Sequence, residues 1–197
     1  GCMGDLGMHA CHVPFRAGWI PKNVRAVLSN LVPLRPDGKG GMASCETWDN
    51  ATLLCEAVNP IDGKLFPWTM KTQRIAPGQK DTWYIEVMGM KKCAGYSSKN
   101  TNSIKILEYT GKEQAWQRID MGHETAFKSI TGGIFEFGFS DSILQMWAAY
   151  LYELAHGKPL KKFAGCVTPR ETALSHRLFT AALQSQRDKS TVTIDES

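Results

Sequence analysis

The N-terminal segment holds the densest group of side chains that could do chemistry. Asp5 and His9 are four residues apart, so on a helix they share one face. A carboxylate in that position can orient an imidazole, fix its tautomer and stabilise its protonated form. The pair is therefore a candidate for general acid/base catalysis, although a simple surface pair is the commoner outcome of this spacing.

A metal site competes for the same segment. Four of its side chains could supply ligands for zinc: Cys2, His9, Cys11 and His12. Their spacing lacks the short paired intervals of a structural zinc site. His123-Glu124 begins like the zinc-protease motif, but Phe127 stands where the second histidine is required. The sequence therefore predicts no metal site.

A second polar group lies in the segment 64–75. Trp68, Lys71 and Arg74 could line a pocket with an aromatic floor, a common way to hold a sugar. The alternative, which we favour on the residues alone, is that Trp68 packs in the core while the two cations face water. The glycine-rich run 38–41 lacks Walker spacing, and no G-x-G-x-x-G or G-x-S-x-G is present. This chain therefore has no visible dinucleotide site.

The elements that must position these residues change type along the chain. The first twenty residues predict a helix with Asp5 near its start, Pro14 as a kink and Gly18 as its end. Alternation and turn residues then predict a series of strands: residues 24–32, 51–58, 64–75, 83–88, 104–109 and 115–119. Residues 33–48, rich in proline and glycine, predict a loop. Pro67 indicates a bulge or an edge strand.

The last third predicts two helices. An apolar stripe at helical spacing runs from about residue 140 to Gly157, and Thr168-Pro169-Arg170-Glu171 is a capping box that opens a helix to about Ser185. Strands followed by helices predict an α+β fold, with one large, mostly antiparallel open sheet and helices packed on one face. With no repeat and no long linker, residues 1–197 are expected to form a single domain.

The composition excludes several classes of protein. Over 197 residues, 23 Lys and Arg face 19 Asp and Glu, and 43% of residues are hydrophobic, which is typical of a globular protein. A net charge of +4 without basic clusters gives no indication of nucleic-acid binding. No apolar run is long enough to predict a membrane span. Six cysteines without a C-x-x-C pair favour free thiols in a reducing compartment.

The glycine-rich start of the chain resembles that of a known family. Gly4-Asp5-Leu6-Gly7-Met8-His9, followed by a helix and the strand that opens at Val24, is similar to the start of the C-terminal domain of Gfo/Idh/MocA oxidoreductases. That family includes glucose-fructose oxidoreductase and inositol dehydrogenase. Its D-x-G-x-H signature is matched by Asp5, Gly7 and His9. The likeness continues through residues 50–58, the glycines of 87–95, the helix ending in G-x-P at 157–159, and residues 170–194. Many members have an acidic residue where this chain has His12.

The resemblance implies a two-domain enzyme. An N-terminal Rossmann domain, absent from this chain, would bind NAD or NADP, and residues 1–197 would be the C-terminal substrate-binding and oligomerisation domain. His9 would be the general acid/base oriented by Asp5, with His12, Trp68, Lys71 and Arg74 as candidates for substrate binding. The substrate would be a sugar or polyol oxidised at a hydroxyl. The isolated chain would be inactive.

The resemblance also implies an oligomer interface, and the composition and the cysteines bear on other partners and on location. The other face of the sheet is the expected interface of a homo-oligomer, a dimer or tetramer, and neither nucleic acid nor a membrane is an expected partner. We expect a cytoplasmic protein, although any signal peptide would lie before the missing domain and so outside this sequence. A non-catalytic assembly or sugar-binding domain of the same α+β type is the alternative. Substrate identity and the choice between NAD and NADP lie outside this sequence.

Overall fold

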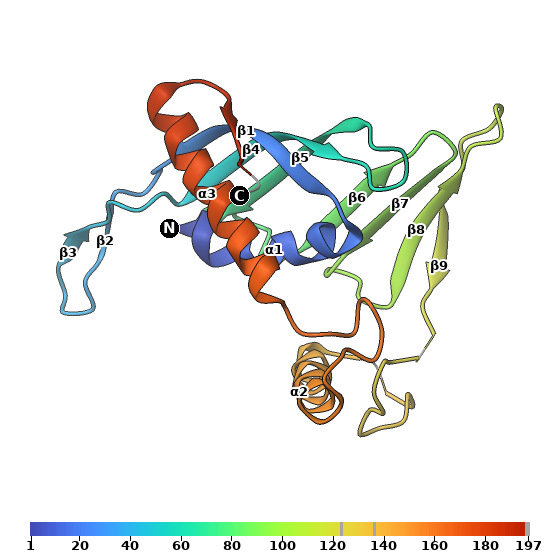
Figure 1. The fold of residues 1–197 in the computed structure, drawn as a ribbon. Helices are drawn as coiled ribbons and strands as arrows, with labels where there is room; N and C mark the ends of the chain where they lie inside the picture. The colour runs from blue at the N-terminus through green and yellow to red at the C-terminus, as the bar shows by residue number, and fades with distance from the viewer. Residues whose placement is uncertain (123, 136, 196–197) are drawn as a thin grey trace. The chain divides into compact units, whose positions relative to one another are not determined.

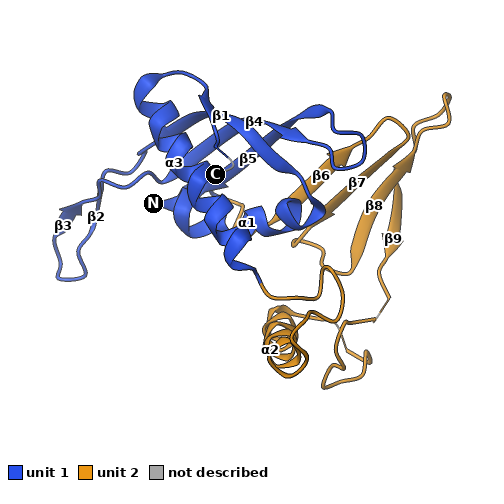
Figure 2. Cartoon of the chain, in the orientation of Figure 1, with its two compact units in different colours: residues 1–77, 167–197 blue, residues 78–166 orange. Residues whose placement is uncertain are grey.

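The structure, a computed structural model, describes residues 1–122, 124–135 and 137–195. His123, the first residue of the pair that resembles a zinc-protease motif, lies outside the described residues. The chain forms two compact units (Figure 2). Unit 1 consists of residues 1–77 with 167–197, and unit 2 consists of residues 78–166.

Unit 1 begins with helix α1 (Cys2–Ala17), which carries the candidate acid/base pair. The helix ends at Gly18, whose φ of 93° lies in the left-handed region that glycine adopts at little cost. The backbone N–H groups of Gly18 and Trp19 donate to the carbonyls of Phe15 and Pro14, both at 2.9 Å. Pro14 thus lies in the last turn of α1, so its missing N–H interrupts only the end of the helix.

The sheet of unit 1 has the strand order β10-β1-β4-β5, and each neighbouring pair is antiparallel. Its strands are β1 (Ile20–Ser29), β4 (Asn50–Val58), β5 (Leu65–Gln73) and the short β10 (Val192–Thr193). Side chains alternate along β4, with Leu53 and Cys55 buried and Leu54 exposed. Pro67 lies in β5, the edge strand, which confirms the edge position that its missing N–H predicts.

Helices α1 and α3 (Pro169–Asp188) cover one face of this sheet (Figure 1). The approach of the two helices depends on Gly7, because a Cβ there would lie 2.9 Å from Cζ of Phe179. Near its C-terminal end, α3 also supplies side-chain acceptors for backbone N–H groups of β1 that lie beyond the short β10. Ala26 N donates to Ser185 Oγ at 2.9 Å, and Leu28 N donates to Gln186 Oε1 at 3.1 Å.

The segment 33–48, expected to be a loop, contains a two-stranded hairpin of β2 (Leu34–Pro36) and β3 (Met42–Ser44), so that expectation is wrong in part. The buried carboxylate of Asp49 anchors this hairpin at the point where it joins the sheet. It accepts hydrogen bonds from the backbone N–H groups of Leu31 and Val32 at 2.9 Å and lies 3.4 Å from Nη2 of Arg35. One buried acid therefore fixes where this hairpin leaves the sheet.

Unit 2 contains a second antiparallel sheet of order β6-β7-β8-β9. The strands are β6 (Tyr84–Met88), β7 (Lys92–Ser97), β8 (Ser103–Glu108) and β9 (Gln117–Asp120). The described strands therefore form two four-stranded sheets and a hairpin rather than one continuous sheet. The α+β class and the antiparallel pairing expected from the sequence are confirmed.

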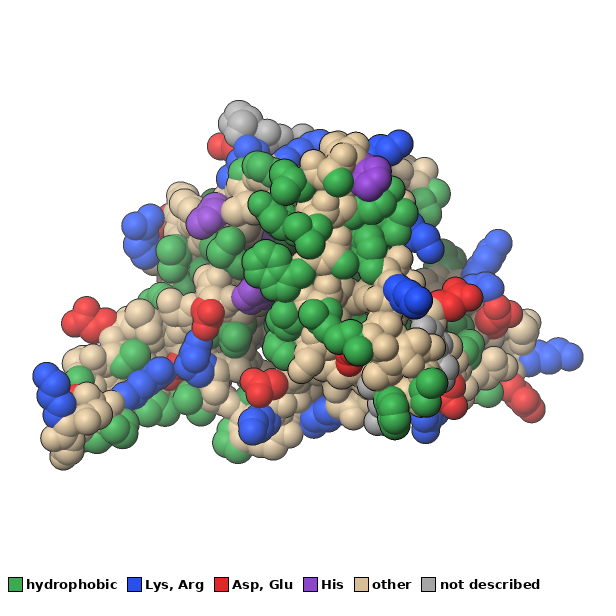
Figure 3. All heavy atoms as spheres, turned by 90° about the horizontal axis from the view of Figure 1, so that it is seen from below, with side chains coloured by type: hydrophobic (Ala, Val, Ile, Leu, Met, Phe, Trp, Pro, Cys, Tyr) green, Lys and Arg blue, Asp and Glu red, His purple; other side chains and the backbone are tan. Residues whose placement is uncertain are grey.

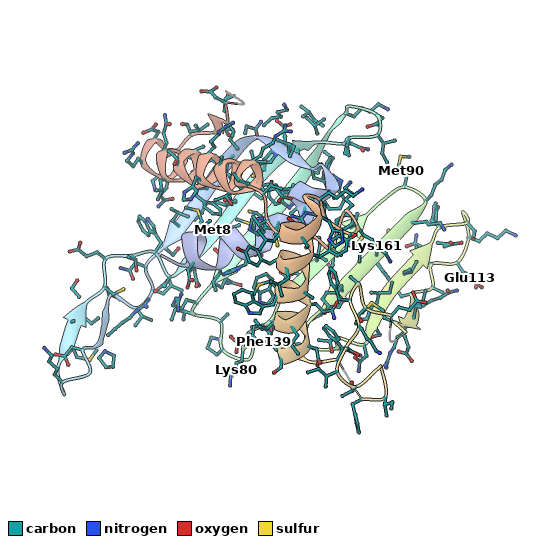
Figure 4. The ribbon with its side chains drawn as sticks, turned by 60° about the horizontal axis from the view of Figure 1, so that its bottom comes forward. Met8, Lys80, Met90, Glu113, Phe139 and Lys161 are labelled. Carbon is teal, nitrogen blue, oxygen red and sulfur yellow. The ribbon has the colours of Figure 1, made fainter. Side chains whose placement is uncertain are left out.

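Helix α2 (Phe139–His156) carries an unusual distribution of side chains. Among the described residues of α2, Ala149 is the only one that is buried. The exposed apolar and aromatic residues of α2 are Phe139, Ile143, Leu144, Met146, Trp147, Tyr150, Leu151 and Leu154. Figure 4 labels Phe139 at the first turn, and Figure 3 shows hydrophobic side chains gathered on the face seen from below. No described helix is both long and apolar enough to cross a bilayer.

Candidate functional site

The exposed side of α1 carries the candidate catalytic pair. Asp5 and His9 are both exposed, whereas Gly7, Cys11 and Phe15 are buried against the rest of unit 1. The helix thus turns its reactive side chains outward and its small and apolar side chains toward the sheet and α3. Because consecutive turns place residues i and i+4 on one side, the spacing alone brings Asp5 and His9 to the same surface.

Arg74 is the residue that the fold adds to this pair. Its guanidinium forms an ion pair with Asp5, in which Nη2 donates to Oδ2. The backbone of Arg74 is fixed as well, because its N–H donates to the carbonyl oxygen of the buried Asp49 at 2.8 Å. Asp49 therefore positions two segments: its carboxylate anchors the β2–β3 hairpin, and its backbone carbonyl fixes Arg74 directly after β5. From there the side chain of Arg74 reaches α1.

A second ion pair joins the end of α1 to the start of α3. Arg16 donates to Glu171 through Nε at 3.0 Å and through Nη2 at 2.8 Å, and both side chains are only 14% exposed. Glu171 also closes the capping box with Thr168, whose backbone N–H donates to its carboxylate at 2.8 Å. The hydrogen bonds from Arg16, together with those from Thr168, lower the pKa of Glu171 to about 2.

His12 lies between these two ion pairs along α1 and is half-buried. Its Nδ1 atom is buried and has no hydrogen-bond partner among the described residues. Burial is the main cause that lowers the pKa of His12; Arg16 and His9 act in the same direction, and Glu171 opposes them. His12 is therefore uncharged at neutral pH, unlike the acidic residue that many members of the resembled family have at this position.

The other two predicted site residues do not share a surface with each other. Trp68 points to the helix-covered side of β5 and contacts Phe15 edge-on, with ring centroids 6.2 Å apart. Lys71, three residues further along the strand, is exposed on the opposite side. Of Trp68, Lys71 and Arg74, the structure thus brings only Arg74 into contact with the Asp5 side of α1.

The buried cysteines do not form a reactive centre. Burial raises the pKa of Cys11 and of Cys55 to about 12, so both remain thiols at neutral pH. Cys11 Sγ lies 3.5 Å from Met70 Sδ inside the core. Over residues 1–122, 124–135 and 137–195, no three His, Cys, Asp or Glu side chains form a group that could hold a metal ion.

Comparison with known proteins identifies the fold of this chain. The sequence matches no family model and no curated protein. Levoglucosan dehydrogenase in complex with NADH and L-sorbose superposes on all of this chain with a TM-score of 0.77 at 14% identity. An NAD binding oxidoreductase from Klebsiella pneumoniae gives 0.79 at 17% identity, also over the whole chain. This chain has the fold of one half of these oxidoreductases.

The match covers only part of each similar protein. The chain spans 51% of each of these two solved structures. A super-repressor mutant of Gal80p from Saccharomyces cerevisiae is also similar, with a TM-score of 0.60 and 15% identity over 96% of this chain and 48% of that one. The fold that the Gfo/Idh/MocA resemblance implies is therefore confirmed, and the same fold also occurs in a protein named as a repressor.

Proposed function

We propose that this chain is the C-terminal, substrate-binding half of an NAD(P)-dependent oxidoreductase that acts on a hydroxyl of a sugar or polyol. The observation that carries the proposal is the Asp5-His9 pair on the exposed side of α1, with Asp5 held by Arg74. The fold supports it, since the similar solved structures include a sugar dehydrogenase with NADH and a sugar bound.

The proposed chemistry divides between the two halves of the full-length protein. Oxidation of an alcohol separates a proton from a hydride, and His9 would take the hydroxyl proton while Asp5 orients its ring. NAD or NADP would supply the hydride acceptor. All strand pairings among the described residues are antiparallel, so this chain offers no parallel strand–helix–strand unit for a dinucleotide. We therefore assign cofactor binding to an upstream domain and expect the 197 residues alone to be inactive.

The remaining candidate residues take different parts in this proposal. The candidates for substrate contact are His12, on the same side of α1 as the pair, and Arg74, whose side chain reaches Asp5 from the end of β5. Trp68 would support α1 by packing edge-on against Phe15. Lys71 lies on the uncovered side of the sheet, where Val27 and Leu54 are 55% and 53% exposed. We propose this side as the homo-oligomer interface, because an exposed apolar sheet face is the usual sign of a partner.

The test is a histidine exchange in the full-length enzyme. Replacing His9 with Ala should lower kcat at least about a hundredfold, the usual cost of losing a general base. His176→Ala, which removes an exposed histidine of α3, is the matched control and should leave kcat unchanged. Full turnover by the His9 variant, with an unchanged melting temperature, would exclude His9 as the base.

A second function is supported by the similarity to the Gal80p variant. In that case the same fold would bind a sugar, or serve assembly, without turning a substrate over. The two functions differ in one measurement on the full-length protein. A sugar that binds but is never oxidised with NAD or NADP would favour the non-catalytic function.

A further inference from the structure

Hydrogen bonds and a ring contact anchor one side of α2 within unit 2. Gln145 exchanges two hydrogen bonds with the backbone of Phe127, accepting from its N–H at 2.9 Å and donating to its carbonyl at 2.8 Å. The ring of Tyr152 lies against that of Phe127, with centroids 5.8 Å apart, and Glu153 accepts from the N–H of Cys166. Gln145, Tyr152 and Glu153 are seven and eight residues apart, so they share one side of the helix.

The opposite side of α2 is apolar, exposed and uncharged. The helix contains no Lys or Arg, and its two acids, Asp141 and Glu153, are half-buried on the anchored side. A monomeric protein rarely leaves a large contiguous apolar patch in water. The central residues of this side are 37–71% exposed: Ile143, Met146, Trp147, Tyr150, Leu151 and Leu154.

The exposed area is large enough for a stable dimer. The apolar side chains of α2 expose on the order of 800 Å², the area that each partner contributes to a standard protein–protein interface. A membrane surface suits this side less well, because helices that lie on membranes carry Lys and Arg beside their apolar face. A partner that is recognised by its charge would find no ionised group here.

The order of the exposed side chains points to a second copy of the same helix. The midpoint of the apolar side lies between Ala148 and Ala149. A two-fold contact requires that residue i of one copy meets residue j of the other, and that j meets i. Residues at equal distances before and after the midpoint are all apolar or aromatic and exposed, which meets this requirement for two antiparallel helices. The three pairs are Ile143 with Leu154, Met146 with Leu151, and Trp147 with Tyr150.

We infer that α2 pairs antiparallel with α2 of a second copy of this chain and so buries its apolar side. Trp147 and Tyr150, which contact each other edge-on with centroids 6.1 Å apart, would lie at the centre, where aromatic residues contribute most to binding. This interface belongs to unit 2, whereas the sheet face proposed as an oligomer interface belongs to unit 1. Two different two-fold interfaces on one chain form a tetramer, and the loss of either leaves a dimer. The inference concerns assembly and does not depend on the proposed reaction.

The first test measures the mass of the full-length protein by analytical ultracentrifugation. Trp147→Glu places one carboxylate from each copy in the middle of the interface. The dissociation constant should then rise at least about thirtyfold, and the mass of the assembly should halve. Met90→Glu changes a side chain of unit 2 that is 94% exposed and lies outside α2, so this matched control should keep the wild-type mass. A monomeric wild type, or a Trp147→Glu variant of wild-type mass, would overturn the inference.

Cross-linking tests the antiparallel register without a charge at the centre of the interface. The half-exposed cysteines Cys45, Cys93 and Cys166 are first replaced by Ser. Ile143→Cys and Leu154→Cys are then introduced singly and together, and diamide is added as the oxidant that takes two protons and two electrons from each thiol pair. The double variant should form a covalent dimer and the single variants none, because each position lies about 16 Å along the axis from its own counterpart. A dimer from a single variant, or from none of the three, would overturn the antiparallel pairing.

Two further measurements separate this inference from other contacts. The similar solved structures are about twice as long as this chain, which covers 51% of them, so an upstream half is the other candidate to cover α2. In that case Trp147→Glu would keep the wild-type mass and speed proteolytic cleavage between the two halves, which would overturn the inference. Leu54→Lys, on the open sheet face of unit 1, should leave the cross-link between positions 143 and 154 intact. Loss of that cross-link would show that α2 is not an interface of its own.

Discussion

Adding one methyl group at Gly7 should destabilise the chain, although glycine is usually a poor residue inside a helix. A Cβ at Gly7 would lie 2.9 Å from Phe179 Cζ, 3.2 Å from Phe179 Cε1 and 3.4 Å from Met70 Cε. Phe179 is 7% exposed and packs in the core, so its ring has no open space to enter. Overpacking of this kind costs about 1–3 kcal/mol. The gain from replacing a helical glycine with alanine offsets up to about 1 kcal/mol of that cost.

Gly4 provides the matched control on the same helix. Nothing lies within 4 Å of a Cβ built at Gly4, so Gly4→Ala gains helix propensity without a clash. The difference in the free energy of unfolding between the two variants therefore isolates the clash at Phe179. We expect Gly7→Ala to be about 1–3 kcal/mol less stable than Gly4→Ala. For a chain of this length that is a gap of roughly 2–12 °C in Tm.

The assay is urea unfolding followed by circular dichroism, supported by calorimetry. A third variant tests the cause directly. In a Phe179→Leu background the ring that meets the new methyl group is gone, so Gly7→Ala should cost less there than in the wild type. Equal stability of Gly7→Ala and Gly4→Ala would refute the reasoning. So would an unchanged cost in the Phe179→Leu background, because the clash would then lie elsewhere.

Two further changes test the contacts that hold the site. Because the pKa of Glu171 falls to about 2 from an ordinary 4.5, its ion pair with Arg16 and its hydrogen bonds from Thr168 should together contribute up to about 3 kcal/mol above pH 4.5. That contribution should be lost as the pH falls toward 2, and Arg16→Met should flatten this part of the stability–pH curve measured by urea unfolding. Asp49→Ala should leave the N–H groups of Leu31 and Val32 without their acceptor. Limited proteolysis should then cut the β2–β3 hairpin markedly faster, and unchanged cleavage would show that the acid does not anchor it.

The elements that the sequence predicts are those that local chemistry determines. Gly18 ends α1 because a left-handed residue can close a helix without help from distant contacts. The box at Thr168 begins α3 because both of its partners lie within four residues. Strand β7 has no such local signal, since Cys93, Ala94 and Gly95 show no apolar alternation. Its place comes from pairing with β6 and β8.

The same distinction between local signals and distant contacts applies to the candidate site. The spacing of Asp5 and His9 is enough to put them on one side of a helix, whereas the Arg74–Asp5 contact joins residues 69 apart and has no local signal. The separation of Trp68 from Lys71 could have been predicted, because residues three apart in a strand point to opposite faces. Residues that are close in sequence should therefore be assigned to one pocket only when the side-chain period of their strand or helix places them on the same face.

The D-x-G-x-H pattern in this chain combines two different requirements on one helix. Asp5 and His9 face outward, so their identity is free to serve chemistry. Gly7, two residues from each, must face inward because helical residues two apart point to nearly opposite sides. There its lack of a side chain lets α1 approach Phe179 and the sheet. The glycine fixes how deeply α1 sits, and the depth of α1 fixes where Asp5 meets Arg74, so the packing residue of the motif determines the geometry of the reactive ones.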